Sequence, residues 1–283
     1  MFTKLQKNYT MKPLIYLHGG PGMNSNPEMH LLKRPYLDAG FRLLFWNEPS
    51  INRPLGYPFR ETDSFQNLLD SAESFFLEQY REFQGEKLPI FAFCYGCIPA
   101  FHLMKLHPEK ISKVILVTPD FCFAEANENM FRLAMKSYEK QRNNFAVEEL
   151  SAALQNYDGS FSATTERGFR QYVASPELFN YYWSDEKSME QFCKYFSGDD
   201  YSLDIEAFFK VRKSMYPVKL NSCDIPCLLI HGTKDRIISI ESEIKNLEGQ
   251  IENLQIVTIE CDHYVHIEAL ETCIATISNF LKP

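Results

Sequence analysis

Cys94 stands where a strand-like apolar run gives way to a helix-compatible segment. The run is Pro89-Ile90-Phe91-Ala92-Phe93, and the segment extends from Ile98 to Leu106. A sharp turn from a strand into a helix exposes the side chain at its apex, and only small residues fit two positions before and after that apex. Ala92 and Gly96 are these small residues. The pattern therefore predicts Cys94 as a nucleophile that attacks through sulfur.

A glycine-rich turn follows another strand-like run near the start of the chain. Residues 13–17 read PLIYL, and residues 18–22 read HGGPG. Glycine-rich turns leave backbone N–H groups free, and such groups stabilise an oxyanion when they point at it. The turn is therefore a candidate for one part of an oxyanion hole.

Two later segments supply an acid and a base. Residues 227–235 read CLLIHGTKD and end in Asp235, whereas residues 262–268 read DHYVHIE and follow a β-rich run. In acyl transfer an imidazole takes the proton of the nucleophile, and a carboxylate orients that imidazole and stabilises its cation. The three residue types occur in the order Cys94, Asp235, His263, which differs from the orders found in chymotrypsin and subtilisin.

The strings HGGPG, HGTKD and DHYVHIE, in this order, resemble the α/β-hydrolase superfamily and are most similar to its prolyl iminopeptidase-like branch. The resemblance extends from about Leu14 to the C-terminus, and HGGPG is its most specific part. It implies an α/β-hydrolase fold, with a mainly parallel sheet covered by helices on both faces. It also implies that Cys94 is the nucleophile, Asp235 the acid and His263 the general base.

The resemblance further implies that the backbone N–H groups of Gly20 and Tyr95 bind the oxyanion, where one donor contributes about 3 kcal/mol. A thiol attacks as the thiolate, which a helix N-terminus and a neighbouring histidine both favour. The first product would be a thioester on Cys94. We therefore expect hydrolysis of small ester, thioester or amide substrates with an apolar acyl group, without a cofactor or a metal. Transfer of the acyl group to an amine is an alternative outcome of the same intermediate.

Three features depart from the iminopeptidase pattern. The nucleophile is cysteine where that branch has serine, and residues 46–54 read WNEPSINRP where that branch has D-Q-R-G-x-G-x-S. Few residues precede the strand at 13–17, so we expect the first hairpin of the sheet to be shortened or absent. Iminopeptidases hold a free amine with carboxylates, and an iminopeptidase activity remains an alternative. Our candidate substrate contacts are Trp46, Glu48 and Trp183.

The acid at Asp235 and the nucleophile at Cys94 each have a competing interpretation. Asp120 ends the strand before a long insertion, which is a second position where this fold can place its acid, although the motif favours Asp235. Cys94 and Cys97 also form the C-x-x-C motif of thioredoxin-like redox proteins. That interpretation leaves HGGPG, HGTKD and DHYVHIE unexplained, so we expect Cys97 to pack inward. A non-catalytic binding protein that keeps the hydrolase pocket is a further alternative.

The remaining histidines of the motifs have a simpler explanation. His18 and His231 belong to turns at strand ends, and His266 lies one turn after His263. We expect all three to be structural.

The composition argues against several classes of protein. The chain has 283 residues, a hydrophobic content of 45% and a net charge of −8. This length suits one α/β domain with an insertion, and the negative charge without a basic run argues against a nucleic-acid partner. No apolar stretch is long enough to span a membrane, and the first residues do not resemble a signal peptide. We expect a cytoplasmic protein with reduced cysteines, a small-molecule acyl substrate, and no membrane partner.

Strand-like runs alternate with helical segments along the chain. The expected strands are Leu14–Leu17, Arg42–Trp46, Ile90–Phe93, Val114–Val117, Leu228–His231 and Gln255–Ile259. The expected helices include Thr62–Phe83, Ile98–Leu106, Ile240–Leu247 and His266–Leu281. Continuously apolar strands that alternate with helices predict a mainly parallel sheet covered on both faces. Such sheets bind ligands beyond the carboxyl ends of their strands, which is where all four motifs lie.

Between Asp120 and about Pro217 the β pattern disappears. This segment is polar, helical in period and rich in aromatic residues. We expect a helical cap at residues 120–217, inserted between two parts of the α/β-hydrolase core at residues 1–119 and 218–283. A cap excludes water from the site beneath it, so we expect it to cover Cys94 and some of its aromatic side chains to line the pocket.

Overall fold

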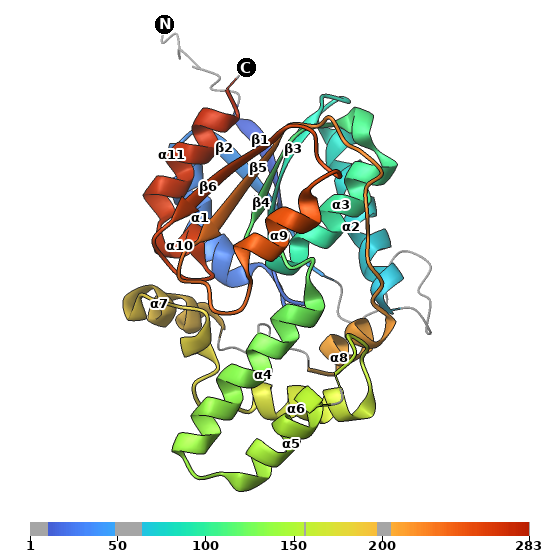
Figure 1. Ribbon diagram of the computed structural model, residues 1–283. Helices are drawn as coiled ribbons and strands as arrows, with labels where there is room; N and C mark the ends of the chain where they lie inside the picture. The colour runs from blue at the N-terminus through green and yellow to red at the C-terminus, as the bar shows by residue number, and fades with distance from the viewer. Residues whose placement is uncertain (1–10, 49–63, 156, 197–204, 283) are drawn as a thin grey trace, which may run out of the picture.

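Six parallel strands form the central sheet of the protein (Figure 1). The computed structural model describes residues 11–48, 64–155, 157–196 and 205–282. The strands are β1 (Lys12–Leu17), β2 (Phe41–Trp46), β3 (Leu88–Phe93), β4 (Ile111–Val117), β5 (Cys227–Gly232) and β6 (Leu254–Ile259). They lie in the order β2-β1-β3-β4-β5-β6, and every neighbouring pair is parallel. The predicted α/β-hydrolase fold and its six strands are confirmed.

Alternate residues of the strands enter two separate cores, because side chains of a strand point to opposite faces of the sheet. On β3, Ile90 and Ala92 pack into one core, and Phe91 and Phe93 into the other. All four are at most 1% exposed. The strands are therefore apolar on both faces and need helices on both sides.

Helices cover both faces of the sheet (Figure 1). They are α1 (Asn26–Asp38), α2 (Ser64–Glu82), α3 (Cys97–Leu106), α9 (Ile240–Leu247), α10 (Val265–Glu268) and α11 (Leu270–Phe280). Side chains of α2, α3 and α9 enter one core, and those of α1 and α11 enter the other. None of the helices in the described ranges is long and apolar enough to cross a membrane.

The predicted helices agree with the structure except at the C-terminus and near the start. The expected single helix over residues 266–281 is divided between α10 and α11, because Ala269 leaves the helical region at φ −115° and ψ 43°. Helix α1 was not expected, since prolines stand at position 27 and, inside the helix, at position 35. Proline at the first turn is tolerated, but an interior proline removes one hydrogen bond and weakens the helical pattern in the sequence.

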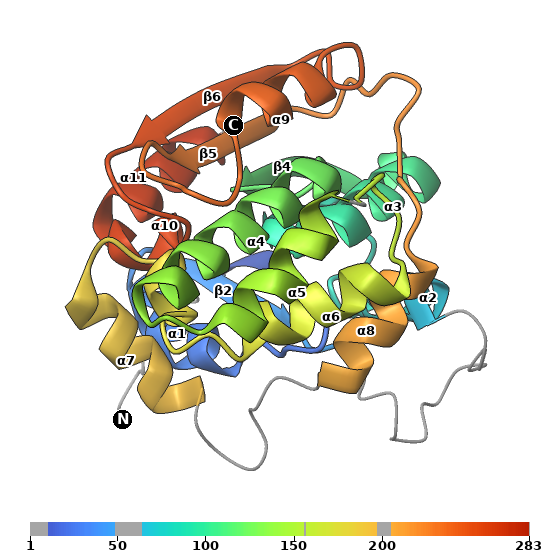
Figure 2. The same ribbon diagram turned by 60° about the horizontal axis from the view of Figure 1, so that its bottom comes forward.

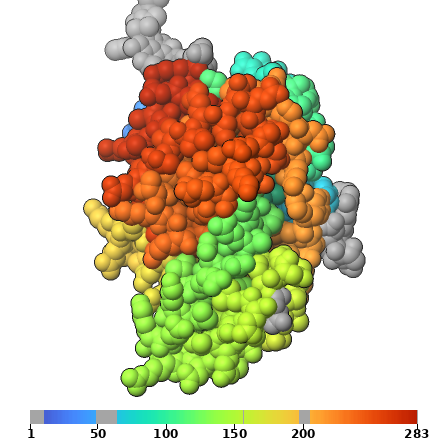
Figure 3. All heavy atoms as spheres, in the orientation of Figure 1, coloured from blue at the N-terminus to red at the C-terminus, as the bar shows by residue number. Residues whose placement is uncertain are grey.

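Five helices lie between β4 and β5 in the described part of the insertion. They are α4 (Phe123–Lys140), α5 (Asn144–Gln155), α6 (Ala163–Val173), α7 (Glu186–Phe196) and α8 (Ile205–Ser214). Figures 1 and 2 place them beyond the carboxyl ends of the strands, and in Figure 3 the green and yellow-green atoms of α4 and α5 form a lobe at the bottom of the molecule. Helices α4, α5, α6 and α8 share a core of their own, which also takes in Ile237 and Ile238 after β5. We call α4 to α8 the inserted helices.

Two of the sequence predictions fall on residues outside the described ranges. The run at 46–54 is described only as far as Glu48, and the residues before Met11 bear on the expected loss of the first hairpin. The expected boundaries at 119/120 and 217/218 stay predictions.

Glu243 of α9 holds the chain where it leaves β4 for the inserted helices. The carboxylate accepts hydrogen bonds from the backbone N–H groups of Cys122 at 2.8 Å and Phe121 at 3.0 Å. The side chain is 1% exposed. Burial, with a smaller effect from the nearby Asp120, raises the pKa of Glu243 to about 8.

The substitution Glu243→Gln should change the pH dependence of the free energy of unfolding. A carboxyl whose native pKa is raised contributes stability that is full below its unfolded pKa near 4.5 and is lost as the pH rises through 8. Between pH 5 and pH 8 the wild type should therefore lose stability relative to the variant, by at most about 1.4 kcal/mol per pH unit. Urea denaturation at several pH values measures this difference.

The matched control is Glu241→Gln, at an exposed position of the same helix. It should leave the pH dependence as in the wild type. A stability difference between the wild type and Glu243→Gln that stays constant over this pH range would contradict the assignment of a raised pKa to Glu243.

Candidate active site

Cys94 occupies the apex of a strained turn between β3 and α3. Its φ is +49°, in the left-handed region that non-glycine residues rarely adopt. The turn continues through a short 3₁₀ helix, η1 (Cys94–Gly96). A Cβ atom on Gly96 would lie 2.4 Å from the carbonyl oxygen of Leu17, and one on Gly19 would lie 3.2 Å from the Cβ of Cys94. The glycines are needed because the end of β1 packs directly against this turn.

The imidazole of His263 and the carboxylate of Asp235 form a buried pair. Nδ1 of His263 lies 2.8 Å from Oδ2 of Asp235, and both side chains are at most 2% exposed. The other oxygen of Asp235 accepts hydrogen bonds from the backbone N–H groups of Ile237 at 2.9 Å and Ile238 at 3.0 Å. These two bonds fix the carboxylate with Oδ2 directed at the imidazole.

The charges of neighbouring groups shift the pKa values of His263 and Asp235. Burial alone would lower the pKa of His263, but the Asp235 carboxylate and the hydrogen-bonded Cys94 sulfur outweigh it and raise that pKa well above its ordinary value. Burial opposes ionisation of Asp235 as well, and the neighbouring His263 overcomes it, so the pKa of Asp235 is lowered. The structure thus brings Cys94, His263 and Asp235 together.

A second ion pair braces the two loops that carry His263 and Asp235. Arg236 donates from Nε to Oδ2 of Asp262 at 3.0 Å, and from Nη2 to the backbone carbonyls of Asn180 and, at 3.3 Å, Trp183. The other oxygen of Asp262 accepts from the backbone N–H of His263 at 3.0 Å. The brace links the acid loop, the histidine loop and the segment between η3 (Phe179–Tyr181) and α7.

The glycine-rich turn after β1 is anchored by Glu48. The carboxylate of Glu48 accepts a hydrogen bond from the backbone N–H of Gly22. The backbone N–H of Glu48 donates to Nε2 of His18 at 3.1 Å. Gly20 has φ +83°, and a Cβ there would lie 2.6 Å from the sulfur of Met23. Only glycine suits this position, where both conformation and space are restricted.

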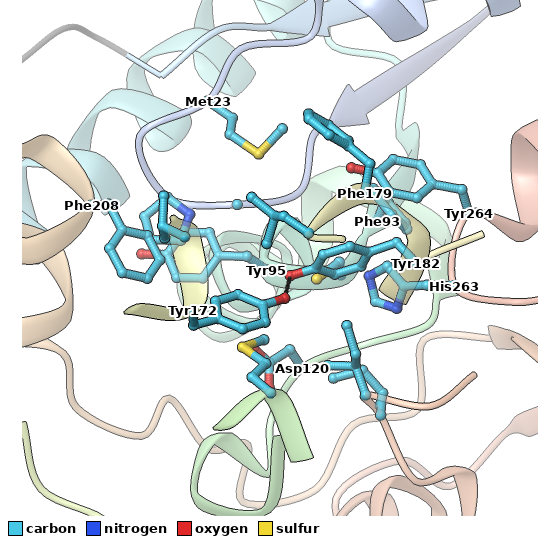
Figure 4. Close-up of a pocket in the computed structure, with 18 of the residues that line it drawn as sticks. Met23, Phe93, Tyr95, Asp120, Tyr172, Phe179, Tyr182, Phe208, His263 and Tyr264 are labelled. Atoms are coloured by element: carbon cyan, nitrogen blue, oxygen red, sulfur yellow. Dashed lines mark hydrogen bonds between the residues drawn. The ribbon is translucent and has the colours of Figure 1, made fainter. Parts of the chain in front are cut away.

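A cavity of about 230 Å³ connects these parts (Figure 4). Cys94, His263, Gly20 and Tyr95 all line it, and its other walls are mostly apolar. The inserted helices contribute Met130 of α4, Tyr172 of α6 and Phe208 of α8 to the lining. Tyr182 reaches from the same insertion to the histidine, with ring centroids 5.3 Å apart, and receives a hydrogen bond from the hydroxyl of Tyr172.

Three residues predicted to contact the substrate lie outside the cavity lining. Trp46 is 1% exposed and stacks on His18 with ring centroids 4.9 Å apart. Trp183 stacks on Tyr264 at 4.3 Å. Glu48, the third, anchors the glycine-rich turn. Trp183 therefore packs behind the lining residue Tyr264, whereas Trp46 packs against His18 of the glycine-rich turn.

Several other expectations concern residues near the elbow. Cys97 is fully buried, and its sulfur faces the backbone carbonyl of Ala92 at 3.5 Å, so the prediction that it packs inward is confirmed. His18, His231 and His266 are also buried and at most 1% exposed. Burial lowers the pKa of His266 to about 3 and that of His18 to about 4.

Asp120 lines the cavity but does not pair with His263. Its carboxylate lies 3.7 Å from Nη2 of Arg212, and both side chains are almost fully buried. Burial raises the pKa of Asp120, while the positive charges of Arg212 and His263 act in the opposite direction. Arg212 and Tyr182 are cavity residues that were not predicted individually from the sequence. Arg212 lies among other basic residues of α8, and nothing local marks it as a cavity residue.

One group outside the cavity has metal-binding residue types. Ligand atoms of Asp70, Glu73 and His102 lie within 4.8 Å of one another. Glu73 is already bound to His107 at 2.7 Å, and Asp70 accepts from Gln66 at 2.7 Å. We interpret the group as an ion-pair network between α2 and α3.

A known protein-family model matches most of the chain. The sequence matches the family model of the alpha/beta hydrolase fold over residues 12–270. A comparison with curated protein sequences gives no match.

Solved structures share the fold at low sequence identity. The proline iminopeptidase-related protein of Thermus thermophilus is 18% identical, with 96% of this chain and 90% of that one covered and a TM-score of 0.65. An esterase of Exiguobacterium antarcticum is 15% identical, with 96% and 92% covered and a TM-score of 0.62. The 2-hydroxy-6-oxo-6-phenylhexa-2,4-dienoate hydrolase of Rhodococcus sp. strain RHA1 is 16% identical, with 98% and 92% covered and a TM-score of 0.61.

The substitution Asp235→Asn should lower the pKa of His263. Removal of the carboxylate charge leaves burial as the main influence, and burial disfavours the imidazolium. Asp120→Asn, the matched control, removes a cavity carboxylate that does not bind the imidazole and should lower this pKa less. NMR titration of the His263 ring protons in the wild type and both variants measures the shifts. A larger shift in Asp120→Asn would identify Asp120 as the acid that controls the histidine.

Proposed function

This chain belongs to the α/β-hydrolase fold family, and we propose that it hydrolyses small acyl substrates with Cys94 as its nucleophile. The substrates are esters, thioesters or amides with an apolar acyl group, and esters and thioesters are favoured. The position of Cys94 supports this most. Its backbone has a left-handed conformation at the turn after β3, and its sulfur contacts the imidazole of the buried His263–Asp235 pair.

In the proposed first step the Cys94 sulfur attacks the substrate carbonyl carbon, and His263 holds the thiol proton. The carbonyl oxygen takes up the electron pair and is stabilised by the N–H groups of Gly20 and Tyr95, which line the cavity beside Cys94. His263 then gives its proton to the leaving alcohol, thiol or amine. The carbon–leaving group bond breaks, and a thioester remains on Cys94.

In the second step water replaces the leaving group. His263, now neutral, takes a proton from the water, whose oxygen attacks the thioester carbonyl. The carbon–sulfur bond breaks, the acid is released, and the proton returns to sulfur. Asp235 would keep the imidazole in one tautomer throughout, because its carboxylate accepts from Nδ1 and leaves Nε2 for the chemistry.

The walls of the cavity support an apolar acyl group. Aromatic and aliphatic side chains such as Phe93, Leu178 and Phe208 make up most of the lining. We propose that the inserted helices act as a cap that excludes water, since Met130, Tyr172 and Phe208 line the cavity that contains Cys94. Among proteins of the same fold, one of those compared is an esterase.

An iminopeptidase activity is the second candidate. It is favoured by the HGGPG turn and by the fold shared with the proline iminopeptidase-related protein. The Glu48 carboxylate, which could bind a substrate amine, is instead bound to the backbone N–H of Gly22. This contact weighs against the iminopeptidase activity.

A redox protein, an acyltransferase and a non-catalytic binding protein are each separated from a hydrolase by a simple observation. A redox role for Cys94 and Cys97 is disfavoured because Cys97 is buried against the backbone carbonyl of Ala92. Acyl transfer would appear as an amide or hydroxamate product when an amine or hydroxylamine competes with water. A non-catalytic binding protein would take up an activated ester without releasing its alcohol.

Cys94→Ala should abolish both ester hydrolysis and covalent labelling. In the wild type, iodoacetamide or a p-nitrophenyl ester should give one preferential adduct at Cys94, visible by intact mass spectrometry and peptide mapping. Cys122→Ala and Cys193→Ala are matched controls, since these two thiols are also only partly buried. They should keep both activity and the adduct, because burial raises the pKa of Cys122 to about 12 and also raises that of Cys193. Equal labelling of several cysteines, with activity retained in Cys94→Ala, would refute a nucleophilic role.

Esters should be better substrates than prolyl amides. A thiolate leaves more readily than an amine, so the tetrahedral intermediate of an amide tends to return to reactants unless His263 protonates the amine in time. The comparison is kcat/KM for a proline arylamide against that for an aryl ester of similar size. A preference of about tenfold or more for the amide would restore the iminopeptidase activity as the main function.

A further inference from the structure

Three residues that line the cavity carry buried polar atoms without a hydrogen-bond partner. In the described part of the chain, Nε of Arg212, Oδ1 of Asp120 and the hydroxyl of Tyr95 have no hydrogen-bond partner. All three residues line the cavity that contains Cys94, and Figure 4 shows Tyr95 and Asp120 there. Arg212 and Asp120 have side chains that are 6% and 2% exposed, and their closest atoms are 3.7 Å apart. Buried polar groups are normally paired, so these three suggest a missing partner in the cavity.

The packing of Arg212 keeps its guanidinium at this place. The group lies over the rings of Phe208 at 5.3 Å and Phe169 at 5.7 Å, and Nη1 is 3.5 Å from the amide oxygen of Asn127. A guanidinium stacked on aromatic rings is held by its faces and presents its N–H groups at the edge. The edge atom Nε is the one that lacks a partner.

Together the three groups restrict which chemical group of a ligand can bind beside them. Arg212 can only donate, an ionised Asp120 can only accept, and the Tyr95 hydroxyl can do either. A ligand carboxylate would bind Arg212 but would meet the charge of Asp120, and an ammonium group would bind Asp120 but meet Arg212. A neutral amide carries an acceptor oxygen and a donor nitrogen, and therefore satisfies both residues without adding charge.

We propose that Tyr95, Asp120 and Arg212 form a subsite for a neutral amide group on the acyl chain of the substrate. The amide oxygen accepts from Arg212 and Tyr95, and the amide N–H donates to Asp120. The chain between this amide and the reacting carbonyl is apolar, as the rest of the lining requires. The proposal rests on the proposed function, because it places the subsite in the same cavity as the nucleophile.

The test is a series of p-nitrophenyl esters that differ only at the far end of the acyl chain. The end group is a carboxamide, an isopropyl group of nearly the same shape, or a carboxylate, each with four to six methylene groups before it. At the best chain length the carboxamide should exceed the isopropyl ester in kcat/KM by about tenfold, the effect of one good buried hydrogen-bond pair. It should also exceed the carboxylate. A preference for the isopropyl or the carboxylate ester at every length would overturn the proposal.

Two single variants test Arg212 and Asp120 through the ratio of kcat/KM between two esters. A smaller fraction of folded protein lowers both values equally and leaves their ratio unchanged. Arg212→Met should remove the preference for carboxamide over isopropyl. Asp120→Asn leaves Arg212 without its counter-charge and should reverse the order of carboxamide and carboxylate. Because loss of one partner leaves a buried charge, the double variant Arg212→Met/Asp120→Asn serves as a folded reference and should prefer isopropyl. Unchanged ratios in all variants would show that the residues do not contact the acyl chain.

Binding to an inactive protein separates this proposal from the proposed function. Calorimetry with Cys94→Ala and the corresponding methyl esters measures the affinity for each end group without turnover. Tighter binding of the carboxamide, lost in Cys94→Ala/Arg212→Met, would support the subsite even if no ester were hydrolysed. Hydrolysis that depends on Cys94, with equal binding of all three end groups, would reject the subsite and leave the proposed function in place.

Discussion

The site depends on two places where backbones approach each other so closely that only glycine fits. A Cβ on Gly96 would lie 2.4 Å from the carbonyl of Leu17, and one on Gly232 would lie 2.2 Å from the carbonyl of Asp262. The first contact joins the cysteine turn to the end of β1, and the second joins the end of β5 to the histidine loop. Without these contacts the turns that carry Cys94, Asp235 and His263 would stand apart, because any side chain would separate the adjoining loops.

Burial gives the charges of the site their influence. In a low-dielectric interior the interaction between two charges is much stronger than in water, so the Asp235 carboxylate can overcome the burial of His263 and raise its pKa. The same interior makes an unpaired polar group costly, which explains why Asp120 and Arg212 lie beside each other. The polar atoms that remain unpaired in these two residues therefore indicate what a ligand must supply. The apolar surroundings therefore strengthen the interaction between His263 and Asp235 and restrict the ligands that can enter the cavity.

Much of the fold and of the proposed nucleophile, acid and histidine could be predicted because their signals are local. Buried parallel strands are continuous apolar runs, and each motif directly follows one, so proximity in the sequence corresponds to position at one edge of the sheet. Arg212 and Tyr182 could not be found in this way, since they reach the cavity only through the packing of the inserted helices. Trp46 was predicted to contact the substrate, but its side chain faces the core with Leu44, as strand alternation requires.

The proposed use of a sulfur nucleophile is consistent with the contacts of His263. Two neighbours raise the pKa of His263, the Asp235 carboxylate and the Cys94 sulfur. While the sulfur is free, the histidine is favoured as a cation, the form that protonates a leaving group. In the proposed reaction an acyl group on the sulfur would replace its hydrogen bond to His263, and this second influence would be lost. That loss would act to lower the pKa of His263 and would favour the neutral imidazole, the form that can activate water for attack on the thioester. Under the proposed mechanism, the chemical state of Cys94 would thus adjust His263 for each half of the reaction.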